Sequence, residues 1–331
     1  MSAKPDVGYR TRIHERAWRR RQMPIVLLFI LDLVLFGIVS GIAPHFASGS
    51  SVRSLIEEGL ILGAAGAAQT VVIISGGIDL SIPAMMGVAA VMLPRLAPTD
   101  ASLWKALLVI FGLAALLGVI NGVAIGFFRA PAIIVTLGTN GIVMGMLEAG
   151  TQGGSFAGNA GNVSGTMRTL ASGQIGPLPI ALFVWLALAL VVSVLLSQTA
   201  FGRRVYTIGS SETVARMSGV NVRSSIVGVY VLSACGAAVA GLLLAGWIGQ
   251  VYPDIGSAYL FTSITVVLIG GCSIMGGSGH YLGTAAGALT LVLLNGLLAV
   301  LNVGPAFYEI LYGVIIFATV GIAKLASAGR G

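Results

Sequence analysis

Ten apolar stretches, most of them about 20 residues long, follow one another along this chain of 331 residues. A helix of about 20 apolar residues crosses the hydrocarbon core of a bilayer, and it satisfies its own backbone hydrogen bonds there. We therefore predict an all-α polytopic membrane protein. Its ten spans cover residues 24–46, 52–75, 80–96, 104–128, 131–150, 177–198, 225–248, 257–275, 280–301 and 305–326.

The composition agrees with a membrane protein and excludes several kinds of site. Only 9% of the residues are charged, against roughly 25% in soluble domains, and the 47 glycines suit helices that pack closely in lipid. The cysteines and histidines have no metal-ligand spacing, no nucleophile–base set is evident, and there is no G-x-x-x-x-G-K-[ST] phosphate loop. We predict no metal site, no catalytic residues and no cofactor on this chain.

Basic residues predict the orientation. Residues 1–23 form a basic arm directly before the first span. The apolar run of that first span is longer than the apolar region of a signal peptide, so we predict that it is retained. With the N-terminus in the cytoplasm, fourteen of the eighteen Lys and Arg residues lie in inner segments. The arm's position favours contact with membrane lipid over nucleic-acid binding. We predict one transmembrane domain over 24–326, an outer loop at 151–176, an inner loop at 199–224 and a cytoplasmic tail at 327–331.

Similar tripeptides indicate an inverted repeat. The second span contains Gly66-Ala67-Ala68 and the seventh contains Gly236-Ala237-Ala238, while the fourth and ninth each contain an Asn-Gly pair. Spans five apart have opposite orientations, so spans 2–5 and 7–10 would form two inverted halves. A rival pairing of Gly76-Gly77 with Gly270-Gly271 does not fit this register.

The inner loop contains the features of a short capped helix. Ser210 or Ser211 can accept free backbone N–H groups at its start, and Gly219 can end it in a left-handed conformation. We expect Val214, Ala215 and Met217 to form a small apolar face. Such a helix could dock in a groove on a partner or lie on lipid.

Four segments resemble the sugar-type permeases of ABC importers, the ribose/xylose/galactose permease family. They are GRRVYTIGSSETVARMSGVNV in the inner loop, SGGIDLS, GVINGVAIGFFRAPAIIVTLGT and VLIGGCSIMGGSGHYLGTAAGALTLVLLNGLL, in the family's order over about residues 50–320. The resemblance implies a ten-span permease subunit of the bacterial inner membrane, with both termini in the cytoplasm. This subunit would import a monosaccharide or related polyhydroxylated solute by alternating access.

The resemblance also implies partners. These are a second permease chain (identical or related), a periplasmic solute-binding protein, and an ATP-binding subunit of double length that holds ATP and Mg²⁺. The inner helix would be the element that couples to the ATPase, through Glu212, Val214, Arg216, Met217 and Gly219. Thr213 stands where the family usually has a second acidic residue, and Pro83 follows the GGIDLS motif where Gly or Ala is common.

The GGIDLS motif is expected at the cytoplasmic turn between spans two and three. Gly76 and Gly77 allow the helix to break, and Asp79 or Ser81 can cap the next helix. Alternatively, Asp79 contacts the ATPase or a basic residue of the inner loop. An interfacial position would avoid most of the cost of burying this carboxylate in lipid.

A few other polar residues lie within the apolar spans. Asp32 is expected to bond to a neighbouring helix, and Asn121, Asn140 and Asn295 either bond between helices or line a route for the solute. An ion- or proton-coupled secondary transporter is the alternative function, and it would need ionisable groups that converge near the midplane. An intramembrane enzyme is disfavoured because no catalytic set is evident.

Two further surfaces are expected to contact partners. We expect Arg53 to be held by the acidic residues one helical turn later, which leaves Arg168 first and Arg95 second to meet the binding protein. We also expect the small residues Gly283, Ala286 and Gly287 to allow close packing between two permease chains.

Overall fold

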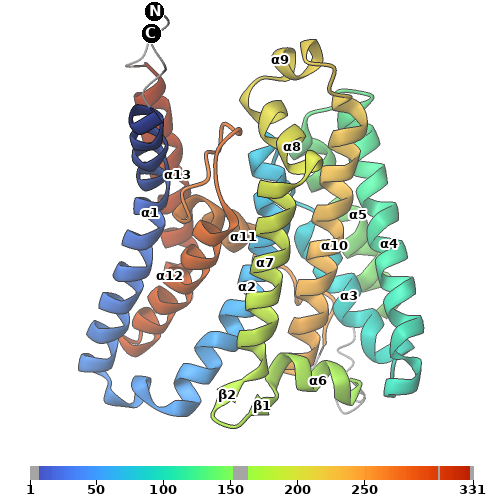
Figure 1. Ribbon diagram of the computed structural model, residues 1–331. Coiled ribbons are helices and arrows are strands. Elements are labelled where there is room, and N and C mark those ends of the chain that lie inside the picture. The colour runs from blue at the N-terminus through green and yellow to red at the C-terminus, as the bar shows by residue number, and fades with distance from the viewer. Residues whose placement is uncertain (1–6, 152–162, 250, 305, 329–331) are drawn as a thin grey trace, which may run out of the picture.

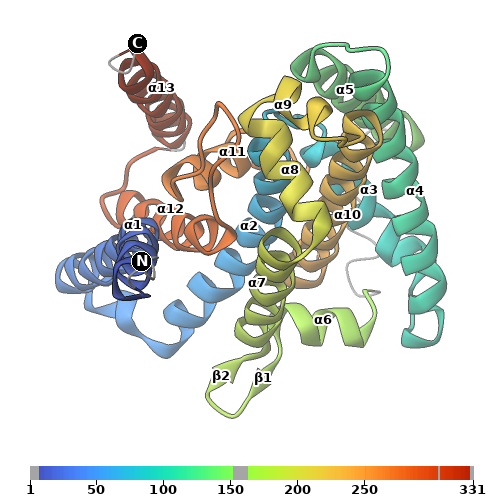
Figure 2. The same cartoon turned by 45° about the horizontal axis from the view of Figure 1, so that its top comes forward.

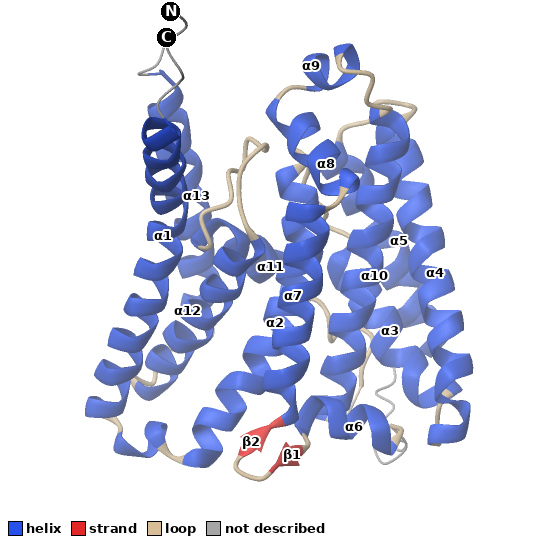
Figure 3. Cartoon of the chain, in the orientation of Figure 1, coloured by secondary structure: helices blue, strands red, loops and turns tan. Residues whose placement is uncertain are grey.

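The computed structural model describes residues 7–151, 163–249, 251–304 and 306–328. The described chain is almost entirely helical, with one hairpin of β1 (Gln174–Ile175) and β2 (Leu178–Pro179) at the end far from α9 (Figure 3). The helices are α1 (Val7–Ile42), η1 (Pro44–Ala47), α2 (Gly49–Ile74), α3 (Ile82–Leu96), α4 (Asp100–Gly126), α5 (Ala132–Thr151), α6 (Gly165–Ser172), α7 (Ile180–Gln198), α8 (Ala200–Ser210), α9 (Glu212–Met217), α10 (Val222–Ile248), α11 (Tyr259–Ile269), α12 (Tyr281–Val300) and α13 (Ala306–Ala328).

Each of the ten predicted spans contains a helix, and the all-α membrane fold is confirmed. By length and composition, seven of the described helices could each cross a membrane, while α3, α11 and the apolar part of α13 are shorter. The predicted span 257–275 was too long, because α11 ends at Ile269. Gly270 follows it and Gly271 has a φ of +80°, a conformation that ends a helix. Helix α1 also extends back through the basic arm to Val7.

Helices α2 and α10 form the centre of the bundle. In the most apolar 18 residues of α2, 89% of the residues are buried inside the protein. In the corresponding parts of α1 and α5, only 11% are buried. Helix α10 packs along α4, α3 and α2, and α2 packs along α12, α11 and α10. Gly236 of α10 meets Ala68 of α2 where the two helices cross. These contacts are symmetric between the two predicted halves, since α2 packs on α11 and α12 as its equivalent α10 packs on α3 and α4.

Small residues bring these helices together. A Cβ on Gly118 or Gly122 of α4 would lie 2.5 Å from the backbone of α10. On α12, a Cβ on Gly283 would lie 2.0 Å from the carbonyl oxygen of Gly270, and one on Gly287 would lie 2.3 Å from the carbonyl oxygen of Val266 in α11. The small face of α12 is therefore used inside one chain, and our expectation that it joins two permease chains was wrong.

The two ends of the bundle differ. The beginning of α1, the end of α13, α8 and α9 lie at one end, and α6 and the hairpin lie at the other (Figure 1). Seen from nearer the α9 end, α8 and α9 lie beside the ends of α4, α5 and α10 (Figure 2). Helices α1, α4, α5, α7 and α13 expose large apolar side chains such as Phe317, 83% exposed, as expected for surfaces against lipid or another chain.

Candidate functional site

Helix α9 is a short, capped helix at the tip of one end of the bundle. The Ser211 hydroxyl accepts the backbone N–H of Val214 at 3.3 Å, and Gly219 follows the helix with a φ of +77°. Val214 is 54% exposed and Met217 is 84% exposed. Two apolar side chains of α9 are thus exposed at the tip of the bundle.

Three other residues of α9 are either buried or paired with each other. Ala215, which we expected on the apolar face, is fully buried against Ile208 and Val222. The Arg216 guanidinium donates to a carboxylate oxygen of Glu212 through Nε at 3.0 Å and also through a terminal nitrogen. This pair, one helical turn apart, brings two opposite charges together on the surface of α9.

Glycines allow α8 to pack closely against the interior of the bundle. A Cβ on Gly209 of α8 would lie 1.9 Å from the carbonyl oxygen of Ile74, at the end of α2. The Gly277 N–H donates to the same carbonyl at 2.9 Å. A Cβ on Gly276 would come within 2.9 Å of both Gly209 and Gly76. We call Gly76, Gly209, Gly276 and Gly277 the glycine junction, where three backbone segments touch because none has a side chain.

The GGIDLS motif begins at this junction and continues into the core. Asp79 is 2% exposed, and one of its oxygens accepts from the Ser81 N–H at 2.9 Å and the Ser81 hydroxyl at 2.5 Å. Its other oxygen accepts from the Ser233 hydroxyl of α10 at 2.7 Å. The carboxylate is thus buried and stabilised by three donors, and among the described residues it makes no ion pair with a basic residue of the inner loop.

The three asparagines make hydrogen bonds between helices. Asn121 of α4 donates to the Ser81 hydroxyl at 2.9 Å and accepts from the Thr139 hydroxyl at 2.6 Å. Asn140 of α5 accepts the backbone N–H of Ala84, in the first turn of α3, at 3.2 Å. Asn295 of α12 accepts from the Tyr312 hydroxyl of α13 at 2.9 Å. Asn121 therefore extends the network around Asp79 to α4 and α5.

Asp32 lies apart from this network. It is 5% exposed, and one of its oxygens accepts from the Thr290 hydroxyl of α12 at 2.6 Å, the interhelical bond that the sequence predicted. It lines a mostly apolar cavity of about 290 Å³ between α1, α2 and α12. Asp32 and Asp79 thus bond to different helices and do not share a site.

The basic residues of the α6 end differ in their availability. Arg53 forms the predicted ion pair with Glu57 at 2.7 Å, and it also donates to the Ser172 carbonyl. Arg95 is exposed and donates to the Gly150 carbonyl at 3.5 Å. Arg168 is exposed on α6, and no ion pair of its side chain is found among the described residues.

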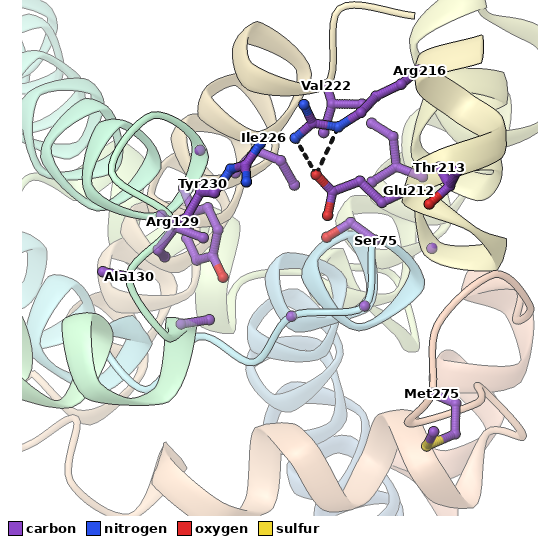
Figure 4. A pocket seen from close by; sticks show the side chains of 17 residues that line it. Ser75, Arg129, Ala130, Glu212, Thr213, Arg216, Val222, Ile226, Tyr230 and Met275 are labelled. Carbon is purple, nitrogen blue, oxygen red and sulfur yellow. Dashed lines mark hydrogen bonds and ion pairs between the residues drawn. The ribbon is translucent and has the colours of Figure 1, made fainter. Parts of the chain in front are cut away.

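A cavity of about 710 Å³ lies beneath α9. It is lined by the α2–α3 turn, the α4–α5 turn, α8, α9, the beginning of α10 and Met275. Arg129 lies on one side and the Glu212–Arg216 pair on the other (Figure 4). This cavity could not be predicted from the sequence, because its walls come from parts of the chain that are far apart in sequence.

Residues 52–320 match the protein family described as "Branched-chain amino acid transport system / permease component". The chain belongs to this permease family. The match includes the GGIDLS turn, α9 and the glycine junction, and it confirms the resemblance to transport permeases that the sequence motifs indicated. The permease is a multi-pass membrane protein.

Curated relatives cover most of the permease. The fructose import permease protein of Rhizobium meliloti is 33% identical over 91% of this chain and 84% of its own length. The ribose import permease protein of Haemophilus influenzae is 27% identical over 88% and 90%. The autoinducer 2 import system permease protein of Salmonella paratyphi A is 29% identical over 92% of both chains. No solved structure is a significant match to the permease.

Proposed function

We propose that this permease is the transmembrane subunit of an ATP-driven ABC importer for a monosaccharide or a related small polyhydroxylated solute. The relatives are import permeases for fructose, ribose and autoinducer 2, so they favour an importer of small oxygen-rich solutes over an ion-coupled transporter. The solute crosses by alternating access, and this subunit does not itself catalyse a reaction.

The observation that carries this function is the geometry of α9. Val214 and Met217 are exposed on a short capped helix, and α8 connects that helix to the glycine junction at the end of α2. Movement of a partner bound to α9 can therefore be passed to the GGIDLS turn. The hydrogen bond between Asp79 and Ser233 then connects that turn to α10. Coupled motion of packed elements is the usual route by which a remote event opens or closes a transport path.

The partners follow from this function. A cytoplasmic subunit, of double length, binds ATP and Mg²⁺ and contacts Glu212, Val214, Arg216 and Met217. A solute-binding protein docks on the opposite face, and a second permease chain, identical or related, completes the path. The α9 end with both termini then lies in the cytoplasm and the α6 end in the periplasm, across the bacterial inner membrane.

The test is reconstitution in proteoliposomes with the ATPase and the solute-binding protein that copurify with this chain or are found by crosslinking to it. We expect ATP-dependent uptake of at least one labelled pentose, hexose, polyol or furanose-like solute. ATP without Mg²⁺ and ATPase with a disabled phosphate loop are the controls. Uptake that proceeds without the ATPase and collapses with a protonophore would instead show an ion-coupled transporter.

A further inference from the structure

We propose that the cavity beneath α9 is a second docking point for the ATPase, in which Arg129 binds an acidic side chain of that partner. Arg129 lies on the α4–α5 turn, 83 residues before Glu212 at the start of α9 and outside the inner loop. The inference rests on the proposed function, because the occupant it names is the ATP-hydrolysing subunit.

Arg129 is held in a specific orientation toward the cavity. Its φ is +55°, a conformation that residues with a Cβ rarely adopt, so the surrounding turn must fix it. The Ala130 N–H donates to the Ala124 carbonyl at 3.2 Å, and Pro131 immediately precedes α5. The side chain is exposed and lines the cavity (Figure 4).

Three other arginines at this end of the bundle have partners. Arg216 is paired with Glu212, the guanidinium of Arg223 stacks over the Phe127 ring at 5.7 Å, and Arg203 donates to the Gln198 carbonyl at 3.2 Å. Among the described residues, Arg129 makes no ion pair, so its charge is the one in the cavity wall that lacks a counter-ion. A guanidinium without a counter-ion can form a bidentate hydrogen-bonded pair with a carboxylate.

The net positive charge of the inner loop and the α4–α5 turn favours a partner with an acidic surface. The inner loop and the α4–α5 turn together hold five arginines (Arg129, Arg203, Arg204, Arg216 and Arg223) and a single acidic residue, Glu212. A protein surface that docks here must supply negative charge, because like charges placed against each other are costly. Glu212, Thr213 and Arg216 of α9 line the cavity, so a protein that contacts Val214 and Met217 on the same short helix lies next to it.

The experiment measures the ATPase association with the purified permease in nanodiscs at several salt concentrations. Because a reversed charge now faces the acidic group, Arg129→Glu should weaken association at least about tenfold, and Arg129→Lys should retain most of it. Arg204→Glu is the matched control, since Arg204 is exposed at the same end but does not line the cavity. Its effect should be several-fold smaller. Size-exclusion profiles establish that each variant is folded, and Arg129→Gln provides the neutral comparison if the reversal does not fold.

A photo-crosslinking amino acid at position 129 identifies the occupant. We expect a crosslink to an acidic segment of the ATPase, and reversal of that acid to Arg should restore association with Arg129→Glu. Equal association of wild type and Arg129→Glu, or a crosslink to lipid alone, would overturn the proposal. If the wild-type permease binds no ATPase at all, then the proposed function fails too. If it binds and transports but Arg129 has no effect, only this second docking point fails.

Discussion

The Ser233 hydroxyl of α10 donates a hydrogen bond of 2.7 Å to the carboxylate of Asp79, 154 residues earlier in the chain. Asp79 belongs to the short turn between α2 and α3, which also contacts α8 through the glycine junction. One hydrogen bond therefore connects the turn beneath α9 to the central helix of the bundle. Asn121 and Thr139 extend the connection to α4 and α5.

Replacement of Asp79 should weaken both stability and transport. In Asp79→Ala, the donors of Ser81 and Ser233 would be left buried without an acceptor, at a cost of about 1–3 kcal/mol. We expect a lower melting temperature in detergent and reduced uptake. A double-mutant cycle with Ser233→Ala should show coupling of about 0.5–3 kcal/mol, because the two side chains share a bond. Additive effects of the two changes would show that the bond contributes nothing.

Steric change at the glycine junction should separate α9 from the core. A Cβ on Gly209 would collide with the Ile74 carbonyl, so Gly209→Ala must push α8 away from α2, at a cost of about 1–3 kcal/mol. Uptake should fall, while ATP hydrolysis by the associated ATPase becomes less dependent on the solute-binding protein. Gly112→Ala on α4 is the control, since nothing lies within 4 Å of its Cβ position. Tight solute-dependent hydrolysis in Gly209→Ala would contradict this role of the junction.

The spans were predictable because their signal is local. An apolar run of about 20 residues is visible without any knowledge of neighbours, and the i, i+4 pair of Arg53 and Glu57 is fixed by helix geometry alone. The capping of α9 by Ser211 follows from the same local rules. The end of α11 was misplaced because Gly270 and Gly271 interrupt a segment whose composition remains apolar.

The site was less predictable because it depends on distant contacts. Nothing in the sequence pairs Asp79 with Ser233, since a serine in an apolar helix has many possible acceptors. The small residues of α12 indicated close packing correctly, but their partner is α11 of the same chain. Arg129 contributed only to the charge count in the sequence, and its left-handed backbone and the cavity are properties of the fold.

Met217 is expected to dock in an apolar groove of the ATPase. It is 84% exposed in the isolated chain, so Met217→Asp should not alter the fold. In the complex it would bury a charge without a partner, which costs several kcal/mol and weakens association by at least about tenfold. Pull-down of the ATPase and uptake assays measure this. Ser218→Asp, an exposed neighbour, controls for added charge. Normal association and full uptake by Met217→Asp would remove Met217 from the contact.

The other end of the permease should use Arg168 to meet the solute-binding protein. Helix α6 presents this residue from a fixed position, because the Asp100 carboxylate of α4 accepts the Thr166 N–H at 2.9 Å. Arg53 is unavailable, since Glu57 and the Ser172 carbonyl occupy it. Arg95 is exposed but already near the Gly150 carbonyl, which places it second. An exposed cation on a rigid helix is well placed to steer an acidic surface into register.

Arg168→Glu should therefore slow association of the solute-loaded binding protein by a few-fold to about tenfold. The remaining association should depend less on salt, because salt screens the attraction that the variant lacks. Stopped-flow association with nanodisc-embedded permease at several ionic strengths measures both effects. Arg53→Gln serves as the comparison: it breaks the ion pair inside the fold and should lower the melting temperature more than it changes the salt dependence. If Arg168→Glu keeps the wild-type rate and the wild-type salt dependence, then the binding protein approaches through another part of this face.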